Sequence, residues 1–418
     1  MLSRQWRPGL ALLAAFCVIS LAALPGPARA AVRQGSGEFA GSAAVDSIRN
    51  SQQWVLDMLD VEAAWSVTEG SGVTVAVIDS GVNPAVSDLT NSVITGPDYT
   101  GVSTSPSSQD WGVHGTWMAS LIAGHGHDGG LSGVIGVAPE ARILSIRTIP
   151  DRADPHYGRY EHERETVIQQ SLADGIKYAV THGAKVISMS IGYSAPSVTV
   201  RSELLDAYHH GVVVIASAGN SGGPSSGPVG KAPESYPADY PGVISVSAVK
   251  ASGAVAGFSS DNLSVKVAAP GVKVLAQGRD GQYWLVSGTS PACALVAGVA
   301  ALIKSKYPRL APDLVAKALD STTTDRPAKG YDSQVGFGIV DAAAALAKAG
   351  RLAGARPVES SIKATVKYHG VLQPAPVRPR GSGQLVLFAL LALTSLVLIA
   401  AAGTRLAVLR RSLSRANR

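Results

Sequence analysis

Cysteine is almost absent from this 418-residue sequence, which contains only two. Cys17 lies in an apolar N-terminal segment that carries the marks of a cleaved signal, so Cys293 is the single cysteine of the mature chain. A lone cysteine excludes an intramolecular disulfide. The protein must therefore be stabilised by a large hydrophobic core, for which the roughly 315 residues between the two chain ends are long enough.

Acidic residues are missing from the first part of the chain. Arg4 and Arg7 precede an apolar stretch from Leu10 to Leu24, and Ala28-Arg29-Ala30 follows it. A basic start, a short apolar run and small residues at the end form the layout of a secretory signal peptide. We expect residues 1–30 to be removed by cleavage after Ala30.

Charge is also absent near the other end, where residues 381–404 hold no charged side chain. About 20 apolar residues cross a bilayer as a helix, so we expect a transmembrane helix at 384–404. Residues 405–418 hold five arginines and no acid, which predicts that this tail is cytoplasmic. A basic, proline-containing linker at 346–383 precedes the span. The expected topology is a single pass through the cell membrane, with the main domain on the extracytoplasmic side.

The net charge of +6 comes from these flanking parts. Residues 1–30 and 405–418 contribute eight arginines, residues 346–383 contribute a net +6, and residues 31–345 are left at −8. Nucleic acid as a partner is therefore disfavoured.

The segment between the ends has no internal repeat and contains several short, almost wholly apolar runs. Such runs predict strands of a parallel sheet covered by helices on both faces. Helical patterns at Glu165–His182 and Val200–His210 alternate with them, which predicts a three-layer α/β domain with a mostly parallel sheet, over residues 54–345. The runs are Val73–Ile78, Ile143–Ile146, Val186–Met189, Val212–Ala216 and Val243–Val246.

Ligands of open parallel sheets bind outside the carboxyl ends of the strands. Three of the runs are followed by residues suited to chemistry: Asp79, the segment Ser190-Ile191-Gly192, and Asn220 on a glycine-rich turn. His114 opens a further apolar helix that extends through Ala123. We expect these groups to converge on one edge of the sheet.

Ser290 lies in Gly288-Thr-Ser-Pro-Ala, directly before an apolar helical segment. Pro291 suits the first position of a helix, so Ser290 is placed at the helix mouth, where a serine serves as an N-cap or as a nucleophile. The two roles are compatible. With His114 as general base and Asp79 orienting it, Ser290 becomes an activated nucleophile. The side-chain amide of Asn220 and the backbone N–H of Ser290 would form an oxyanion hole.

These blocks (Asp79-Ser-Gly, His114-Gly-Thr, Ala218-Gly-Asn220 and Gly288-Thr-Ser290) resemble the signature blocks of subtilisin-like serine proteases, peptidase family S8, in that family's order. The resemblance runs from about Trp54 to Ala345. It implies a serine endopeptidase that acts through an acyl-enzyme on protein or peptide substrates without a cofactor. It also implies substrate-binding roles for Ser190, Ile191 and Gly192 as a pairing strand, Ala218 and Gly219 as a pocket wall, and Ser235 at the pocket floor. The alternative interpretation of these glycine-bearing segments is that they are merely tight turns.

The layout of signal peptide, protease, linker, span and short tail resembles the mycosins, the subtilases associated with type VII secretion in actinobacteria. This resemblance implies secretion-complex subunits as partners. A structural role in such a complex, with proteolysis secondary, is the alternative function. Residues 31–53 are too few for a folded inhibitory pro-domain, which needs roughly 60 or more residues. We expect them to form an extension that lies over the domain.

Other polar clusters stay open at this point. The charged loop at 150–165 either selects substrate or is a solvated insertion. Its His156 and His162 fit no metal-ligand spacing, and His125 and His127 beside Asp128 are equally ambiguous. We predict no metal in catalysis, and a structural calcium ion stays open. Cys293 sits in an apolar helix, where a buried, inert thiol is expected.

Overall fold

The computed structural model describes residues 36–39, 45–158, 164–223, 232–354, 393–395 and 401–405. The expected signal peptide, most of the expected membrane span and residues 406–418 lie outside these residues. Within the described residues, no helix is both long and apolar enough to cross a membrane. Contacts divide the chain into Met1–Arg356 and Pro357–Arg418, and the fold is that of the first unit.

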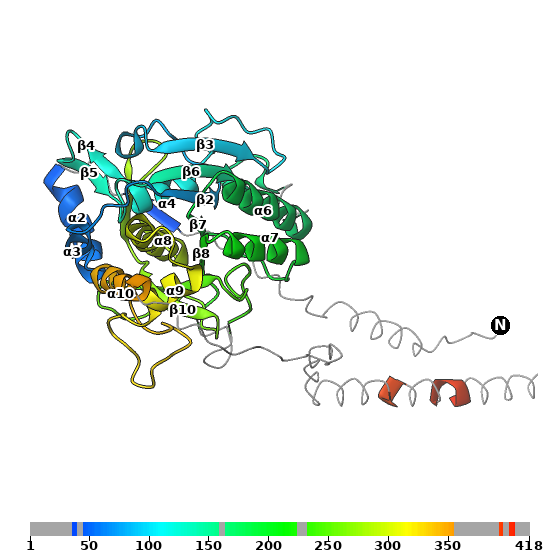
Figure 1. Ribbon diagram of the computed structural model, residues 1–418. Coiled ribbons are helices and arrows are strands. Elements are labelled where there is room, and N and C mark those ends of the chain that lie inside the picture. The colour runs from blue at the N-terminus through cyan, green and yellow to red at the C-terminus, as the bar shows by residue number, and fades with distance from the viewer. Residues whose placement is uncertain are drawn as a thin grey trace, which may run out of the picture. The chain divides into compact units, whose positions relative to one another are not determined.

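A seven-stranded sheet forms the centre of this unit (Figure 1), and every pair of neighbouring strands is parallel. The strand order is β10-β9-β8-β7-β2-β6-β3. β6 and β3 lie on one side of β2, and β7 to β10 lie on the other, so the order of the strands reverses its direction beside β2. Open α/β sheets bind ligands at such a switch point. The strands are β2 (Thr74–Asp79), β3 (Val93–Asp98), β6 (Arg142–Arg147), β7 (Val186–Met189), β8 (Val213–Ser217), β9 (Ile244–Val249) and β10 (Val265–Pro270).

Successive side chains of the central strands enter two separate cores, because side chains alternate between the faces of a sheet. Val75 and Val77 pack in one core, and Ala76 and Ile78 pack in the other. The first core contains α4 (Val113–Ala123) and α8 (Thr289–Lys306), and the second contains α6 (Arg164–Thr181) and α7 (Val198–His209). Figure 1 shows these two layers on either side of the sheet. The predicted three-layer α/β fold with a parallel sheet is confirmed.

Two small antiparallel sheets and further short elements surround the α/β core. One sheet has the order β1-β12-β11 and the other is the hairpin β4-β5. The remaining elements are β1 (Ser36–Phe39), α2 (Val45–Met58), α3 (Val61–Trp65), η1 (Ser87–Leu89), β4 (His125–His127), β5 (Ser132–Ile135), β11 (Val274–Gln277), β12 (Tyr283–Ser287), α9 (Pro312–Asp320) and α10 (Ala342–Gly354).

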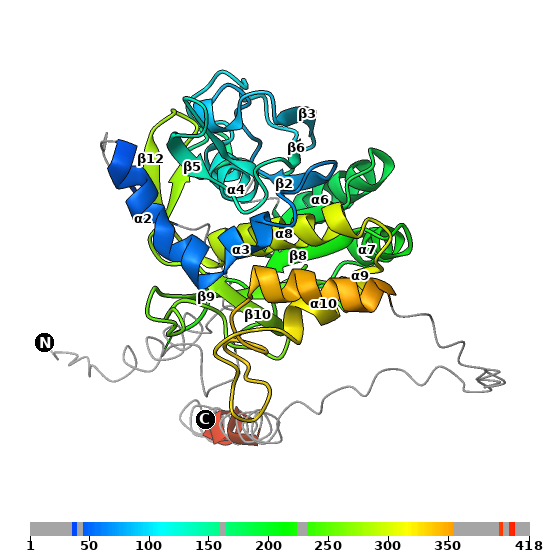
Figure 2. The same ribbon diagram turned by 60° about the vertical axis from the view of Figure 1, so that its left-hand side comes forward.

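The N-terminal extension contributes structure to this domain. Ser36–Phe39 adds a strand to β12, with Glu38 opposite Leu285, and α2 runs alongside β5 (Figure 2). The side chain of Gln52 both donates to Ile135 O and accepts from Ile135 N. At the other end of the domain, α10 continues to Gly354, beyond residue 345 where we expected the peptidase domain to end.

Candidate active site

Asp79 and His114 form a buried pair at the carboxyl edge of the sheet. Asp79 is the last residue of β2, and His114 is the second residue of α4. His114 Nδ1 and Asp79 Oδ1 are 2.8 Å apart, and the two side chains are 2% and 1% exposed. Asp79 Oδ1 also accepts from the Ser80 N–H at 2.7 Å. With Nδ1 bound to the carboxylate, the ring presents Nε2 on its opposite side.

Glycines explain how the helix reaches the strand end so closely. A Cβ atom on Gly115 would lie 2.1 Å from the carbonyl oxygen of Gly81, so only glycine permits this approach. The Gly115 N–H donates to Ser80 Oγ at 3.0 Å, and the Asn83 N–H donates to Thr116 Oγ1 at 2.9 Å. The Asp-Ser-Gly and His-Gly-Thr blocks are thus a docked pair of segments.

Ser290 is the second residue of α8 and its side chain is 2% exposed. The helix begins at Thr289 with Gly288 as its N-cap, so our placement of Pro291 at the first helical position was wrong by two residues. Ser290 lies two positions after the N-cap, so the expected capping role of Ser290 was also wrong. The carbonyl of Ser290 accepts from Ser190 Oγ at 3.2 Å.

His114 Nε2 is buried and has no hydrogen-bond partner among the described residues. The pair Asp79–His114 is therefore assembled, while no hydrogen bond joins it to Ser290 here. Catalytic hydrogen bonds are often long without substrate and tighten only when it binds. Helices α4 and α8, which carry His114 and Ser290, pack against each other.

Thr289 connects the serine to the Gly-Asn turn, a link that we did not predict. Asn220 Oδ1 accepts from the Thr289 N–H at 2.8 Å and from Thr289 Oγ1 at 3.0 Å. The Gly219 N–H donates to Thr289 Oγ1 at 3.2 Å. Because the amide oxygen of Asn220 is fixed by these donors, its Nδ2 group is directed away from Thr289.

A surface cavity lies beside Ser290 and contains four of the six predicted substrate-binding residues: Ser190, Gly192, Gly219 and Ser235. Asn220, Tyr193 and Glu234 also line it, and the last two were not predicted. Ile191 and Ala218 are 1% and 0% exposed and do not line the cavity. Both side chains are part of the core, so the cavity is lined by the neighbouring residues instead.

The hydroxyl of Ser235 lies between the two glycine segments of this cavity. A Cβ atom on Gly192 would be 2.7 Å from Ser235 Oγ, and one on Gly219 would be 3.2 Å away. The Ser235 N–H donates to Asp239 Oδ2 at 3.0 Å, which fixes the backbone that carries the hydroxyl. The Ser235 hydroxyl therefore limits the depth of the space between Gly192 and Gly219.

A second buried carboxylate, Asp151, contacts the histidine helix and was missed by the sequence analysis. It accepts from the N–H groups of Val113 and His114, and burial raises its pKa to about 6 even though these two hydrogen bonds lower it. For His114, burial alone lowers the pKa. The charge and hydrogen bond of Asp79, together with the charge of Asp151, outweigh burial and raise the pKa above its ordinary value.

The charged loop after β6 is anchored in its first half. Arg147 is 1% exposed and contacts Asp154 at 2.9 Å, Asp98 at 2.6 Å and the Ser80 carbonyl at 3.1 Å. Asp151 and Asp154 are both buried, whereas Arg152, Ala153 and Pro155 are exposed, so two carboxylates anchor a segment that is otherwise largely solvated. His162 lies outside the described residues.

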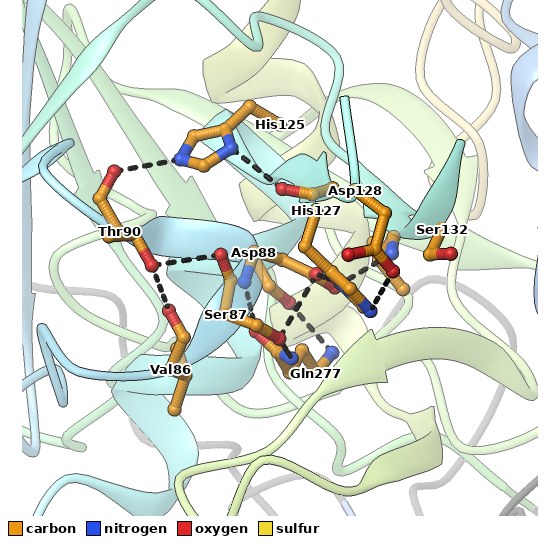
Figure 3. A network of polar contacts seen from close by, with 12 residues as sticks. Val86, Ser87, Asp88, Thr90, His125, His127, Asp128, Ser132 and Gln277 are labelled. Carbon is orange, nitrogen blue, oxygen red and sulfur yellow. Dashed lines mark hydrogen bonds and ion pairs between the residues drawn. The ribbon is translucent and has the colours of Figure 1, made fainter. Parts of the chain in front are cut away.

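The ambiguous histidines after α4 belong to a separate polar network around Asp88 (Figure 3). Asp88 is fully buried, and its oxygens accept from His127 Nδ1 at 2.6 Å, the Val134 N–H at 2.7 Å and Tyr283 at 3.1 Å. His125 contacts backbone carbonyls. In the described part of the chain, no three His, Cys, Asp or Glu side chains are grouped as for a metal ion.

Cys293 is completely buried, and burial raises the pKa of its thiol to about 12. Its sulfur lies 3.7 Å from both Ser188 Oγ and the Met189 carbonyl oxygen. The expected inert, core-packed thiol is what this environment produces.

A parallel α/β sheet with an Asp–His pair at its switch point, and a serine at a neighbouring helix mouth, defines the class of serine hydrolases. The Peptidase S8 (subtilase family) profile matches residues 70–338, which is more than half of the chain. The chain therefore belongs to the subtilase family and is a subtilisin-like serine peptidase.

Two relatives show how much of the family the chain represents. Fervidolysin of Fervidobacterium pennivorans is 35% identical over 322 residues, which cover 71% of this chain and 44% of fervidolysin. Subtilisin DY of Bacillus licheniformis is 34% identical over 278 residues, covering 66% of this chain and 92% of that protein. The chain thus spans less than half of fervidolysin and nearly all of subtilisin DY.

Among solved structures, the serine protease MycP1 aligns with a TM-score of 0.59 and 32% identity, covering 76% of this chain and 93% of MycP1. That protein is an essential component of the type VII (ESX-1) secretion system. The resemblance to mycosins is confirmed.

Proposed function

We propose that the chain is a serine endopeptidase in which Ser290 is the nucleophile, His114 the general base and Asp79 the orienting carboxylate. The observation that carries this proposal is the buried hydrogen bond of 2.8 Å between Asp79 and His114, next to the helix that bears Ser290. A carboxylate on Nδ1 leaves Nε2 as the basic nitrogen of the ring and stabilises the imidazolium that forms.

In the first step, Ser290 Oγ attacks the carbonyl carbon of the scissile peptide bond while its proton passes to His114 Nε2. The negative oxygen of the tetrahedral intermediate accepts hydrogen bonds from Asn220 Nδ2 and from the backbone N–H of Ser290. The second residue of a helix has no carbonyl partner four residues earlier within that helix, so its N–H is available to donate to the intermediate. One donor of this kind contributes roughly 100- to 1000-fold to kcat.

The intermediate then collapses as His114 gives its proton to the leaving amine, and the acyl group remains on Ser290 as an ester. A water molecule attacks the ester with His114 again acting as base, which releases the acid and restores the serine. The neutral imidazole is the active form. Catalysis by these residues involves no cofactor.

The cavity beside Ser290 favours a substrate with a small side chain at P1, the residue on the acyl side of the cleaved bond. Gly192 and Gly219 leave room between two backbone walls, and Ser235 Oγ closes that room from below. A substrate backbone would lie along Ser190–Gly192 as an added strand. We expect alanine, serine and glycine to fit this space, and leucine and phenylalanine to collide with the hydroxyl.

We further propose that the enzyme acts on the extracytoplasmic side of a cell membrane, anchored by residues 384–404 and exported through residues 1–30. MycP1 is part of a secretion system, which supports secretion-complex subunits as partners and a structural role there as the second candidate function. Rescue of a deletion strain's secretion by the Ser290→Ala chain would favour that structural role. Failure of rescue would favour proteolysis.

Residues 31–53 are proposed to be a structural extension, because β1 pairs with β12 and Gln52 holds β5. N-terminal sequencing of active enzyme isolated from membranes should find these residues still attached. Recovery of activity only in chains that begin beyond residue 53 would contradict this role.

The test of the proposed activity is labelling of the full-length chain with a fluorophosphonate, which reacts with activated serines. Labelling and peptide hydrolysis are expected in the wild type and absent in Ser290→Ala. Ser305→Ala, a serine near the far end of the same helix, is the matched control and should behave as the wild type. Labelling that persists in Ser290→Ala would assign the reactive serine elsewhere.

A further inference from the structure

We propose that Asp151 is a positioning residue of this site, whose carboxylate holds the first turn of α4 and thereby sets the place of His114. This inference rests on the proposed role of His114 as the base. Asp151 Oδ2 accepts from the Val113 N–H at 2.8 Å, and Oδ1 accepts from the His114 N–H at 3.0 Å. Asp151 lies in the loop after β6 and is 3% exposed.

The first N–H groups of α4 need an acceptor from outside the helix, because its N-cap residue offers no side-chain acceptor. Its N-cap is Gly112, with φ 74°, and no side chain in the described chain caps the helix locally. The first N–H groups of a helix have no partner within it, and negative charge at this end is stabilised by the helix dipole. Asp151 thus supplies from 37 positions away what an N-cap aspartate supplies locally.

The first turn is held from two sides of His114. The Gly115 N–H donates to the hydroxyl of Ser80, the residue that follows Asp79 in the sequence. The N–H groups of Val113 and His114 donate to the carboxylate of Asp151. A rotation or slide of α4 would break both sets of contacts. His114 is therefore placed against Asp79 by its backbone as well as by its ring.

Asp151 is linked to a buried neighbour, because its carbonyl oxygen accepts from the Asp154 N–H at 3.0 Å. The neighbouring Asp154 accepts from Arg147 at 2.9 Å, and the guanidinium of Arg147 lies 5.8 Å from the centre of the Trp111 ring. Trp111 in turn packs against Gly81, where a Cβ atom would be 2.7 Å from the ring. The carboxylate is part of the buried frame of the site.

The charged groups that face Asp151 come from three elements: His114 on α4, Asp79 on β2, and Arg279 after β11. Arg147, at the end of β6, is engaged by Asp98 and Asp154. Burial raises the pKa of Asp151 to about 6, while the charges of Asp79 and Asp151 raise the pKa of His114, so both groups must lose a proton before the neutral base is present. The site is active only when Asp151 has lost its proton, so that it can accept from the helix N–H groups, and His114 has lost its proton, so that it can act as the base.

Asp151→Asn is the informative change, because the amide keeps the size of the side chain but places an NH₂ group against a helix N–H. Full-length wild type and variant are compared in detergent, with rates per fluorophosphonate-labelled site measured from about pH 5 to about pH 9. We expect kcat to fall about 10- to 100-fold, as for a displaced catalytic group, with KM changed less than about twofold. Asp110→Asn, which removes a nearby carboxylate that does not touch the α4 N–H groups, should keep the wild-type kcat.

The pH profile separates positioning from folding. On the acid side, log kcat/KM of the wild type should rise with a slope of about two, because two protons leave, and the slope should fall to about one in Asp151→Asn. The midpoint of the variant should also lie lower, because the charge that raises the pKa of His114 is gone. A merely structural Asp151 would reduce the number of labelled sites and leave kcat per site and the slope unchanged, which overturns the proposal.

The two proposals can fail separately. Labelling that survives Ser290→Ala removes the proposed function itself. Ser290-dependent labelling together with an unchanged kcat and slope in Asp151→Asn removes only the role of Asp151. Should the variant fold too poorly to be labelled, Asp151→Glu, which keeps the carboxylate but displaces it by one methylene, is measured in its place, and an unchanged kcat per labelled site then contradicts the inference.

Discussion

Replacing Ser235 by glycine should broaden the P1 preference of the enzyme. Ser235 Oγ lies within 2.7 Å of an ideal Cβ on Gly192 and within 3.2 Å of one on Gly219, so it fills the space that a larger P1 side chain would enter. The change removes two non-hydrogen atoms, Cβ and Oγ. The backbone hydrogen bond from Ser235 N to Asp239 remains available to glycine, so the loop should keep its place.

The size of the effect follows from the volume that is opened. One methylene more or less in an apolar specificity pocket changes transition-state binding by about 1–3 kcal/mol, or roughly 10- to 200-fold in kcat/KM. Two atoms are removed here, and the ratio of kcat/KM for leucine over alanine at P1 should rise at least about 10-fold. The rate on alanine substrates should change little, because alanine already fits above the hydroxyl.

The assay uses full-length enzyme, titrated with fluorophosphonate, on tetrapeptide anilides that differ only at P1. Ser221→Gly is the matched control, since it removes the same two atoms from another part of the cavity and should leave the ratio unchanged. A wild type that already prefers leucine or phenylalanine, or a Ser235→Gly ratio equal to that of the control, would refute the interpretation of Ser235 as the floor.

Three further predictions concern pH, packing and the Asp88 network. Because Asp79 and Asp151 raise the pKa of His114, and the neutral ring is the base, kcat/KM should rise with a midpoint above 6.5, and a flat profile from about pH 5 to about pH 9 would contradict the assigned base. Gly115→Ala should lower the free energy of unfolding in urea by about 1–3 kcal/mol and abolish fluorophosphonate labelling, because the new Cβ atom would collide with the Gly81 carbonyl oxygen. Gly257→Ala is the control and should change neither quantity, because its Cβ atom would lie in open space. His127→Ala should lower the free energy of unfolding by about 1–2 kcal/mol by removing a donor to buried Asp88, and a loss no larger than that of exposed His209→Ala would count against this.

The central strands could be predicted from the sequence because both of their faces are buried. Val186–Met189 was predicted to the residue, and the run Val73–Ile78 differs from β2 by one position at each end. β3 escaped prediction because it is a half-exposed edge strand that contains Gly96 and Pro97. Its pattern resembles a loop, and only pairing with β6 makes it a strand.

The site was partly predictable for the same reason. Asp79 ends one buried strand and Asn220 follows another, so the rule that ligands bind at strand ends located them. Asp151 follows β6 in the same way, but the many charges after it matched a solvated insertion as well as a functional loop. Its role depends on two backbone N–H groups of α4, and no sequence pattern records that contact.

The placement of Ser290 shows a different limit. Pro291 indicated the start of a helix, yet the helix begins two residues earlier at Thr289, because Thr289 is held by the side chain of Asn220. This contact joins residues 69 positions apart, and local propensity contains no information about it.

The central claim is that Ser290, activated by the Asp79–His114 pair, cleaves peptide bonds. The most direct measurement is mass spectrometric mapping of the fluorophosphonate adduct on the full-length wild-type chain. The claim predicts one adduct, on Ser290, that forms with loss of peptide hydrolysis and is much slower to form in His114→Ala. An adduct on another serine, or equal labelling rates in the wild type and His114→Ala, would contradict it.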